Sequence, residues 1–357
     1  MTSSSFQVDR PLRRFRSVSL ATVFTIYVLI LVGGIVRASG AGMGCPDWPT
    51  CFGRWIPPVA ESQLPSDYQE IYAERGYKDT TFNVRKTWIE YLNRLLGVFT
   101  GLWIMATVFF SLPLRKRDSK LVTVSVAGLL LVIFQGWLGS RVVASNLAPG
   151  MITLHMLLAQ VIVCMLIYAF LRANRTSMIM ASSAALPRLA HALLWLAVGV
   201  TALQLLTGSQ VREAIDIISK ANNNANRHLW IDNLPFIFAF HRFLAYPTVL
   251  VNLALGIYIL QHKGLAPSAR RVAIAVIGLT VSTMAMGLSL DRLNVPAFAQ
   301  PLHLWLASMI LGGLFYLVFA NHYAATSAQP VNTGGDSATG SGSDEETERW
   351  QTAAETR

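Results

Sequence analysis

The sequence predicts an all-α, polytopic membrane protein with eight transmembrane helices arranged as two repeated four-helix bundles. The chain has 357 residues, of which 53% are hydrophobic and only 13% are charged, and its mean hydropathy is +0.45. This composition suits lipid better than water. Apolar stretches of about 20 residues, the length that crosses a bilayer, recur along the chain. The two halves also carry similar polar residues at matching spacing.

The apolar stretches set the order of the elements. The eight spans are expected at roughly 17–36, 90–112, 121–140, 150–171, 189–209, 236–260, 271–290 and 299–320. The predicted units are a cytoplasmic N-terminal segment (1–16), an N-terminal four-helix half (17–175), a C-terminal four-helix half (187–322) and a tail (323–357). Gly, Ser, Thr and acidic residues dominate the tail, which we expect to be disordered and cytoplasmic.

Basic residues in the short connections indicate the orientation. They precede the first span, join the second to the third and precede the seventh: Arg10, Arg13, Arg14, Arg16, Arg115, Lys116, Arg117, Lys120, Arg270 and Arg271. Because cytoplasmic loops are enriched in Lys and Arg, both termini should be cytoplasmic, in a bacterial inner membrane. The net charge of +10 then suits an anionic leaflet, and no nucleic-acid partner is expected. The first span is too long for a signal peptide and should remain in the chain.

Two outer loops, 37–88 and 212–234, are long, and the first contains the sequence GAGMGCPDWPTCFGRW. Cys45 and Cys51 lie in it among Gly and Pro residues that favour turns, on the oxidising side, so a disulfide is expected. A redox role is an alternative, and a metal site is disfavoured because no His is nearby. The third cysteine, Cys164, is expected in the core.

An internal repeat relates the two halves. The segment IEYLNRLLGVFTGL aligns with IFAFHRFLAYPTVL, which places Asn93 opposite His241, and His155 similarly falls opposite His303. The separation is 62 residues in both halves, from 93 to 155 and from 241 to 303. Upstream, LVGGIVR resembles LLTGSQVR. A duplicated four-helix unit follows from these matches.

Two histidines on facing helices of one bundle point to a haem iron, whereas zinc would require more ligands. The alternative is that His241 and His303 are polar packing residues, which the repeat disfavours. Arg242 and Arg292 have two equally good interpretations. They could neutralise the propionate groups of a haem, or they could anchor their helices at the membrane interface. The remaining histidines are expected to be structural or solvated: His191, His228, His262 and His322.

The segments EYLNR, QGWLGSRVVASNLAPGMITLHMLLAQ, HRFLAYP and PLHLWLAS, with the paired-cysteine loop, resemble the haem A synthase family over all eight spans. The resemblance implies two haem-binding four-helix halves and oxidation of the C8 methyl of haem O to a formyl group by successive hydroxylations, for haem-copper oxidases. It further implies a partner haem O synthase; the electron donor is unspecified, and a homo-oligomer is compatible with the sequence.

Carried over by the same resemblance, His241 and His303 are iron ligands of a cofactor haem b, with Arg242 beside it. Glu90 matches the essential glutamate, and His155, Asn93 and Arg94 fall at the substrate-haem site.

The departure from the family pattern is Asn93, where a histidine is usual. An Asn is a poor replacement for an imidazole ligand. Two interpretations stay open: an iron position left free for oxygen chemistry, or a diverged b-type cytochrome that no longer makes haem A. Glu90 argues for the first, because a membrane carboxylate is costly unless it functions. Glu90 could instead be a water-facing acid at the start of a helix. For the whole protein, a haem transporter and a plain di-haem cytochrome are further alternatives.

Overall fold

The computed structural model describes residues 9–78, 80–222 and 225–327. Within these ranges the protein is helical, and eight of its helices are long and apolar enough to cross a membrane, which confirms the predicted fold class. The long helices are α1 (Arg10–Ala38), α3 (Val84–Ser111), α4 (Ser119–Ala144), α5 (Pro149–Met180), α6 (Arg188–Ala221), α7 (Phe236–Gln261), α8 (Pro267–Arg292) and α9 (Ala299–Ser327). The short ones are η1 (Glu61–Gln63), α2 (Tyr68–Ile71), η2 (Ala73–Arg75), η3 (Leu112–Leu114) and η4 (Arg227–Leu229).

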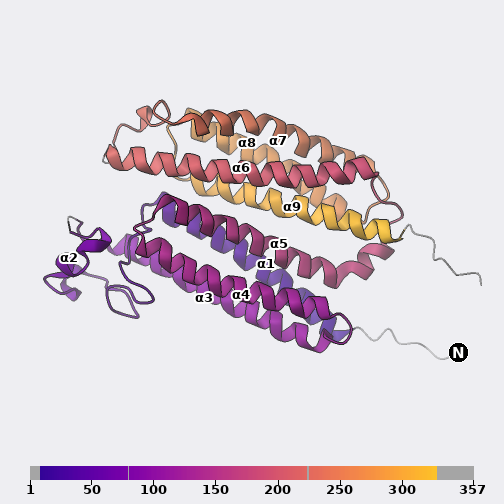
Figure 1. Cartoon of the computed structure of the whole chain (residues 1–357), viewed down its shortest axis with the longest axis horizontal. Helices are drawn as coiled ribbons and strands as arrows, with labels where there is room; N and C mark the ends of the chain where they lie inside the picture. The colour runs from indigo at the N-terminus through magenta and orange to yellow at the C-terminus, as the bar shows by residue number, and fades with distance from the viewer. Residues whose placement is uncertain (1–8, 79, 223–224, 328–357) are drawn as a thin grey trace, which may run out of the picture.

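The long helices form two groups of four that lie side by side (Figure 1). In the first group α1 packs on α3, α3 on α4, α4 on α5, and α5 back on α1. In the second group α6, α7, α8 and α9 close the same kind of ring. Contacts of α9 with α1 and α5, and of α5 with α6, join the groups. The chain order within each ring is therefore the same, as a duplicated unit requires.

Local sequence explains where several helices begin. The side chain of Asp9 accepts a hydrogen bond from the Leu12 backbone N–H at the start of α1, and Asn83 does the same for Lys86 at the start of α3. Helices α5 and α8 each begin with a proline, Pro149 and Pro267. A proline costs nothing there, because the first N–H groups of a helix have no partner within it.

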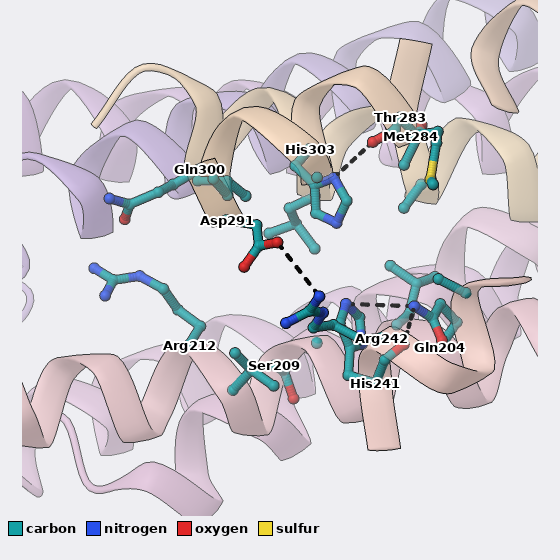
Figure 2. A pocket seen from close by; sticks show the side chains of 18 of the residues that line it. Gln204, Ser209, Arg212, His241, Arg242, Thr283, Met284, Asp291, Gln300 and His303 are labelled. Atoms are coloured by element: carbon teal, nitrogen blue, oxygen red, sulfur yellow. Dashed lines mark hydrogen bonds and ion pairs between the residues drawn. The ribbon is translucent and has the colours of Figure 1, made fainter. Parts of the chain in front are cut away.

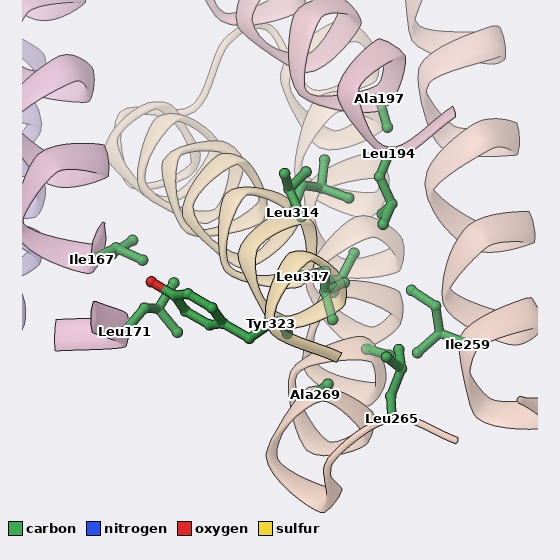
Figure 3. Packing of buried hydrophobic residues seen from close by; sticks show 14 of the residues in the cluster. Ile167, Leu171, Leu194, Ala197, Ile259, Leu265, Ala269, Leu314, Leu317 and Tyr323 are labelled. Carbon is green, nitrogen blue, oxygen red and sulfur yellow. The ribbon is translucent and has the colours of Figure 1, made fainter. Parts of the chain in front are cut away.

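The largest core cluster fills the space between the two groups and inside the second (Figure 3). Leu194 of α6, Ile259 of α7, and Leu314 and Leu317 of α9 are almost completely buried in it, and Leu171 of α5 extends it into the first group. Many large apolar side chains on the outer surfaces are instead exposed. An apolar exterior around a packed interior is what a lipid environment requires.

Polar contacts tie the two groups together at the end that carries the long first loop. Asp216 of α6 binds Arg37 of α1, with O–N distances of 3.0 Å to Nε and 2.8 Å to Nη2. The same carboxylate contacts Arg212 at 2.5 Å through its other oxygen. Deeper in the bundle, the Trp305 indole donates a hydrogen bond of 2.9 Å to the carbonyl oxygen of Tyr27.

Helix α6 corrects one predicted boundary. The sequence placed residues 212–234 in an outer loop, but α6 continues to Ala221. Val211 and Ile215 share a buried face that packs against Trp230 and Val295, and Asp216 pairs with Arg212 one turn earlier. The buried face and the ion pair keep this polar segment helical after it leaves the apolar span.

The predicted tail from 323 onward is helical to Ser327 because α9 extends that far. Residues 328–357, and the first eight residues of the predicted N-terminal segment, lie outside the described residues. Helix α1 begins and α9 ends at the same end of the bundle, opposite the long first loop (Figure 1). An even number of spans produces this arrangement.

Candidate functional site

The four positions matched by the repeat lie close to helix starts at one end of the bundle. His241 and His303 fall within the first two turns of α7 and α9, His155 within the first two turns of α5, and Asn93 in the third turn of α3. This is also the end that carries the Cys45–Cys51 loop. The structure thus places all four side chains near the same end of the bundle.

In the second group the two histidine rings face each other. Their centroids are 6.4 Å apart and their planes differ by 73° (Figure 2). A metal–imidazole bond of about 2.0–2.1 Å, plus the roughly 1 Å from ring nitrogen to ring centre, places two rings on opposite sides of one metal about 6 Å apart. The observed separation fits an iron between His241 and His303.

Hydrogen bonds orient both rings. Nδ1 of His303 lies 3.0 Å from the Thr283 carbonyl oxygen, which leaves Nε2 for a ligand. Nδ1 of His241 lies 3.0 Å from the Thr207 hydroxyl. The Gln204 amide donates a 3.0 Å bond to the His241 carbonyl oxygen and lies 3.3 Å from its Nε2. Each imidazole is therefore held from the helix beside it, as metal-bound histidines usually are.

A cavity of about 290 Å³ contains this histidine pair. Its lining is mainly apolar and comes from all four helices of the second group, with Gly34, Arg37 and Met156 contributed by the first. The volume is near the lower limit for ligand pockets in proteins. An apolar cavity with two imidazoles on its walls suits a flat, hydrophobic, metal-containing ligand.

Cationic side chains lie around the outer part of the cavity. Arg242, Arg292 and Arg212 all line it together with Asp291. Arg242 approaches Asp291 at 3.7 Å, and its guanidinium stacks 5.4 Å from the Phe238 ring centre, whereas Arg292 lies 3.5 Å from Asp291. Guanidinium groups in this place suit the carboxylates of a ligand whose apolar part is buried below.

In the first group, two of the matched positions carry orphaned polar atoms. Nδ1 of His155 and Oδ1 of Asn93 are buried and have no hydrogen-bond partner among the described residues. The Gln135 amide donates a 2.7 Å bond to the His155 carbonyl oxygen, and its own Oε1 is also unpaired there. Each unmet buried group costs about 1–3 kcal/mol, so this cluster favours a ligand or water that supplies the partners.

A glycine lies against each of the four positions. A Cβ added to Gly208 would be 3.0 Å from Cε1 of His241, and one added to Gly287 would be 3.1 Å from Cε1 of His303. The matching pairs in the first group are Gly139 with His155, at 3.3 Å, and Gly33 with Asn93, at 4.0 Å from Oδ1. A larger residue at Gly208, Gly287 or Gly139 would press on the histidine ring beside it, whereas an added Cβ at Gly33 would make an ordinary contact with Asn93.

Sequence reasoning missed these glycines and the polar partners, although a signal exists. Gly139 precedes His155 by 16 residues, as Gly287 precedes His303, and Gln135 and Thr283 each precede their histidine by 20. Extending the repeat comparison backward from the histidines would have found them.

Glu90 and Arg94 lie at the mouth of the first group and bind each other at 2.5 Å. Glu90 is only 4% exposed and accepts a 2.9 Å hydrogen bond from the Cys45 backbone N–H. It is therefore not the water-facing acid at a helix start that the sequence left open. The Arg94 guanidinium donates to three loop carbonyl oxygens, at 2.6 Å from Asp47, 2.9 Å from Thr50 and 3.1 Å from Cys45. Both side chains thus clamp the outer loop onto α3.

The predicted disulfide between Cys45 and Cys51 is present, with an S–S distance of 2.04 Å. Behind it, Phe52 makes edge-to-face contacts with four aromatic rings: Tyr68, Tyr72, Tyr77 and Phe82. Burial raises the pKa of the Tyr77 phenol, whose hydroxyl donates a 2.5 Å bond to the Met43 carbonyl oxygen. The loop is therefore a small packed lid. Cys164 is free and half-buried.

The remaining histidines show no such arrangement. His191 contacts the Asn321 amide at 3.0 Å near the opposite end of the bundle, and His262 stacks beside Tyr258. In the part of the chain that the structure describes, no group of three or more His, Cys, Asp or Glu side chains is placed to hold a metal ion. A pair of imidazoles, as haem uses, is the only metal-binding arrangement that these contacts indicate within the described ranges.

Comparisons with known proteins show which family the chain resembles. The family model described as "Cytochrome oxidase assembly protein" (COX15-CtaA) matches residues 16–315. A "Heme A synthase" of Shewanella oneidensis is 28% identical over 277 residues, covering 76% of this chain and 80% of that protein. One from Rickettsia canadensis is 24% identical over 327 residues, covering 82% and 94%. One from a Wolbachia species is 33% identical over 161 residues, covering 41% and 47%.

Proposed function

The chain belongs to the cytochrome oxidase assembly protein family COX15-CtaA, and from this premise we propose that it is a haem A synthase that oxidises the C8 methyl of haem O to a formyl group. The observation that carries the proposal is the pair of His241 and His303 rings, whose centroids are 6.4 Å apart. Asn93 and His155 occupy the matching positions in the first group, beside the buried Glu90. Relatives named heme A synthase match most of the chain and support the proposal.

The second group is the electron-supplying half. His241 and His303 would hold the iron of haem b, which when bound supplies one-electron transfer. The protein's own contribution is orientation and exclusion of water: Thr207 and the Thr283 carbonyl hold the rings, and the apolar cavity surrounds them. Arg242 at the rim would bind a carboxylate of the ligand.

The first group is the substrate half. His155 would hold the iron of haem O, Asn93 is the other residue of the repeat-matched pair, and Arg94 fixes the loop above them. Glu90 would hold or pass on a proton beside the reacting methyl group, at a carboxylate oxygen released by Arg94 or the Cys45 N–H. The equivalent residue in the second group is Phe238, which cannot carry a proton. The difference fits a division between chemistry and electron supply.

The two halves touch through the helix that carries His155. Met156, the next residue on α5, lines the cavity of the second group. One turn away, the Thr153 hydroxyl contacts Ser209 at 3.2 Å and Glu213 at 2.5 Å on α6. The proposed sites therefore share the wall that α5 and α6 form, which suits electron transfer from one to the other.

A second candidate is a membrane b-type cytochrome or haem-handling protein without haem A synthesis. Asn93 favours it, because this position carries His in the chain's own second half. In that case the second group would still bind haem b and the first would make no product.

The protein has eight membrane spans. We further propose that it lies in the bacterial cell membrane with both termini cytoplasmic, as the basic loops indicate, and receives haem O from a haem O synthase. The lid would then face the oxidising side, where a disulfide is stable. No nucleic-acid partner is proposed.

The test is chromatography of haems extracted from cells that express this chain with a haem O synthase. We expect haem A in the extract, and none from cells with the synthase alone. If the extract contains haem O without haem A while haem b is still bound to the purified protein, haem A synthesis is contradicted. The b-type cytochrome would then be the remaining candidate. The His241→Ala variant serves as a control that should abolish both the product and the bound haem b.

A further inference from the structure

Three of the four repeat-matched positions are histidines, and the fourth is Asn93. The structure shows that the asparagine occupies the same architectural place as the others. Its Oδ1 faces Gly33 at 4.0 Å from an added Cβ, as His241 faces Gly208. Gly33 and Gly208 each precede an arginine by four residues, Arg37 and Arg212, in the aligned first helices. Asn93 therefore points toward the site and not away from it.

Asn93 is nevertheless unable to complete the ligand set. The far nitrogen of an imidazole reaches further from the backbone than either terminal atom of an asparagine. An amide oxygen is also a weak ligand for haem iron, and an amide nitrogen has no free lone pair. Oδ1 of Asn93 is buried without a hydrogen-bond partner among the residues described, so nothing in this part of the protein fills the gap.

The neighbouring polar side chains are engaged elsewhere. Glu90, one turn before Asn93, has one oxygen bound to Arg94 at 2.5 Å and the other to the Cys45 N–H at 2.9 Å. Arg94 is not a metal ligand, and both of its Nη atoms already donate to the lid or to Glu90. Glu90 would have to abandon the lid to reach a metal. Among the described residues beside Asn93, His155 is then the one imidazole that can serve as a ligand.

We propose that the first group holds haem iron through His155 alone and keeps the Asn93 face as a binding site for a small exogenous iron ligand, of the class of carbon monoxide or dioxygen. This inference rests on the proposed haem site of the first group. The second group cannot offer such a site, because His241 and His303 take both faces. The Asn93 amide would border the exogenous ligand, and a polar group at this place is what controls the binding of such ligands to haem.

The experiment uses the full chain purified from cells that also express a haem O synthase, reduced with dithionite and titrated with carbon monoxide. Total haem per chain and carbon-monoxide-reactive haem per chain are measured by absorbance. We expect one reactive haem per chain and one unreactive haem. The His155→Ala variant should lose the reactive haem and keep the other.

Two reciprocal substitutions make the test specific. Asn93→His supplies the second imidazole, so haem content should stay constant while carbon monoxide binding falls at least tenfold. His241→Asn gives the second group the donor set of the first, so the fraction of haem that this half retains should react with carbon monoxide. A low-spin spectrum in the Asn93→His protein, in place of a high-spin component in the original, would give independent support.

The proposal is overturned if the haem that depends on His155 does not react with carbon monoxide, or if no haem depends on His155. The haem extract of the same cells separates this result from the fate of the proposed function. If the cells make haem A but the protein has no haem that reacts with carbon monoxide, the inferred binding site is wrong and the proposed haem A synthesis stands. A reactive haem without haem A keeps the inference and removes the proposed oxidation.

Discussion

The two halves of this protein share a scaffold and differ in what covers it. Each half is a ring of four helices with two repeat-matched polar residues near one end, and a glycine lies against each of these residues. The first half adds the disulfide-linked lid and the buried Glu90, whereas the second has Phe238 at the position of Glu90 and, among its described residues, no disulfide-linked lid. The repeated helices thus set where ligands lie, and the residues and loops above them set what each site can do.

A single matched pair shows how far the divergence goes. Arg94 and Arg242 follow the matched positions directly, but the Arg94 side chain is 13% exposed and the Arg242 side chain 50%. Arg94 is consumed by loop carbonyl oxygens, whereas Arg242 remains at the rim of a cavity, beside Asp291. The same residue therefore serves the lid in one half and remains available for a ligand carboxylate in the other.

Removing a histidine of the second half should have the largest effect. In the His303→Ala variant we expect the haem b of that half to be lost, because one of its two iron ligands is gone. The measurement is haem per chain in the purified protein. His322→Ala, on the same helix at the far end, is the matched control and should keep full haem content. Retention of haem in His303→Ala would break the assignment of the second half.

Replacing the carboxylate of the first half should abolish its chemistry without emptying the site. Glu90→Gln keeps an acceptor for the Cys45 N–H but cannot carry a proton, so haem A production should fall by roughly 10²–10⁴-fold with haem content retained. The readout is the ratio of haem A to haem O in extracts. Unchanged haem A production would show that the two halves do not differ in proton handling, and would favour a plain di-haem cytochrome.

The glycine that supports each histidine should tolerate nothing larger. Gly287→Val places methyl groups against the His303 ring, and we expect haem occupancy to fall about 10–100-fold, the range for disturbed support of a metal ligand. Gly278→Val on the same helix meets no atom within 4 Å and should leave occupancy unchanged. Equal loss in both variants would attribute the effect to the helix and not to the site.

Loss of the disulfide in the lid should have the smallest effect of these changes, and the effect should be confined to the first half. Replacing Cys45 and Cys51 with Ser removes a short cross-link, which costs about 2 kcal/mol or less in the chain-entropy model and is confined to the loop. We expect faster proteolysis of the loop and unchanged haem b in the second half. In unreduced membranes, thiol reagents should label neither cysteine of the original protein, and labelling of both would remove the bridge.

The sequence predicted the features that depend on composition and on spacing. Apolar length predicted the eight spans, and the 62-residue spacing predicted that His155 and His303 occupy matching places. It did not predict that Arg94 binds the loop carbonyls of Asp47 and Thr50, because those contacts arise when a segment more than 40 residues away folds back. The extension of α6 to Ala221 was also missed, since it depends on packing against Trp230 and pairing of Asp216.

The carboxylate of Asp216 lies between Arg37 and Arg212, which are equivalent residues of the two repeats. The position equivalent to Asp216 in the first repeat is Ala41. A symmetric dimer of identical units could not have this arrangement. Each unit would carry the same residue at the position of Asp216, so two carboxylates would face two guanidinium groups. Joining the units in one chain permits a single anion to be shared by both. The covalent fusion thus allows the two units to differ in a way that a symmetric dimer cannot, and the proposed division of labour between the halves depends on the same difference.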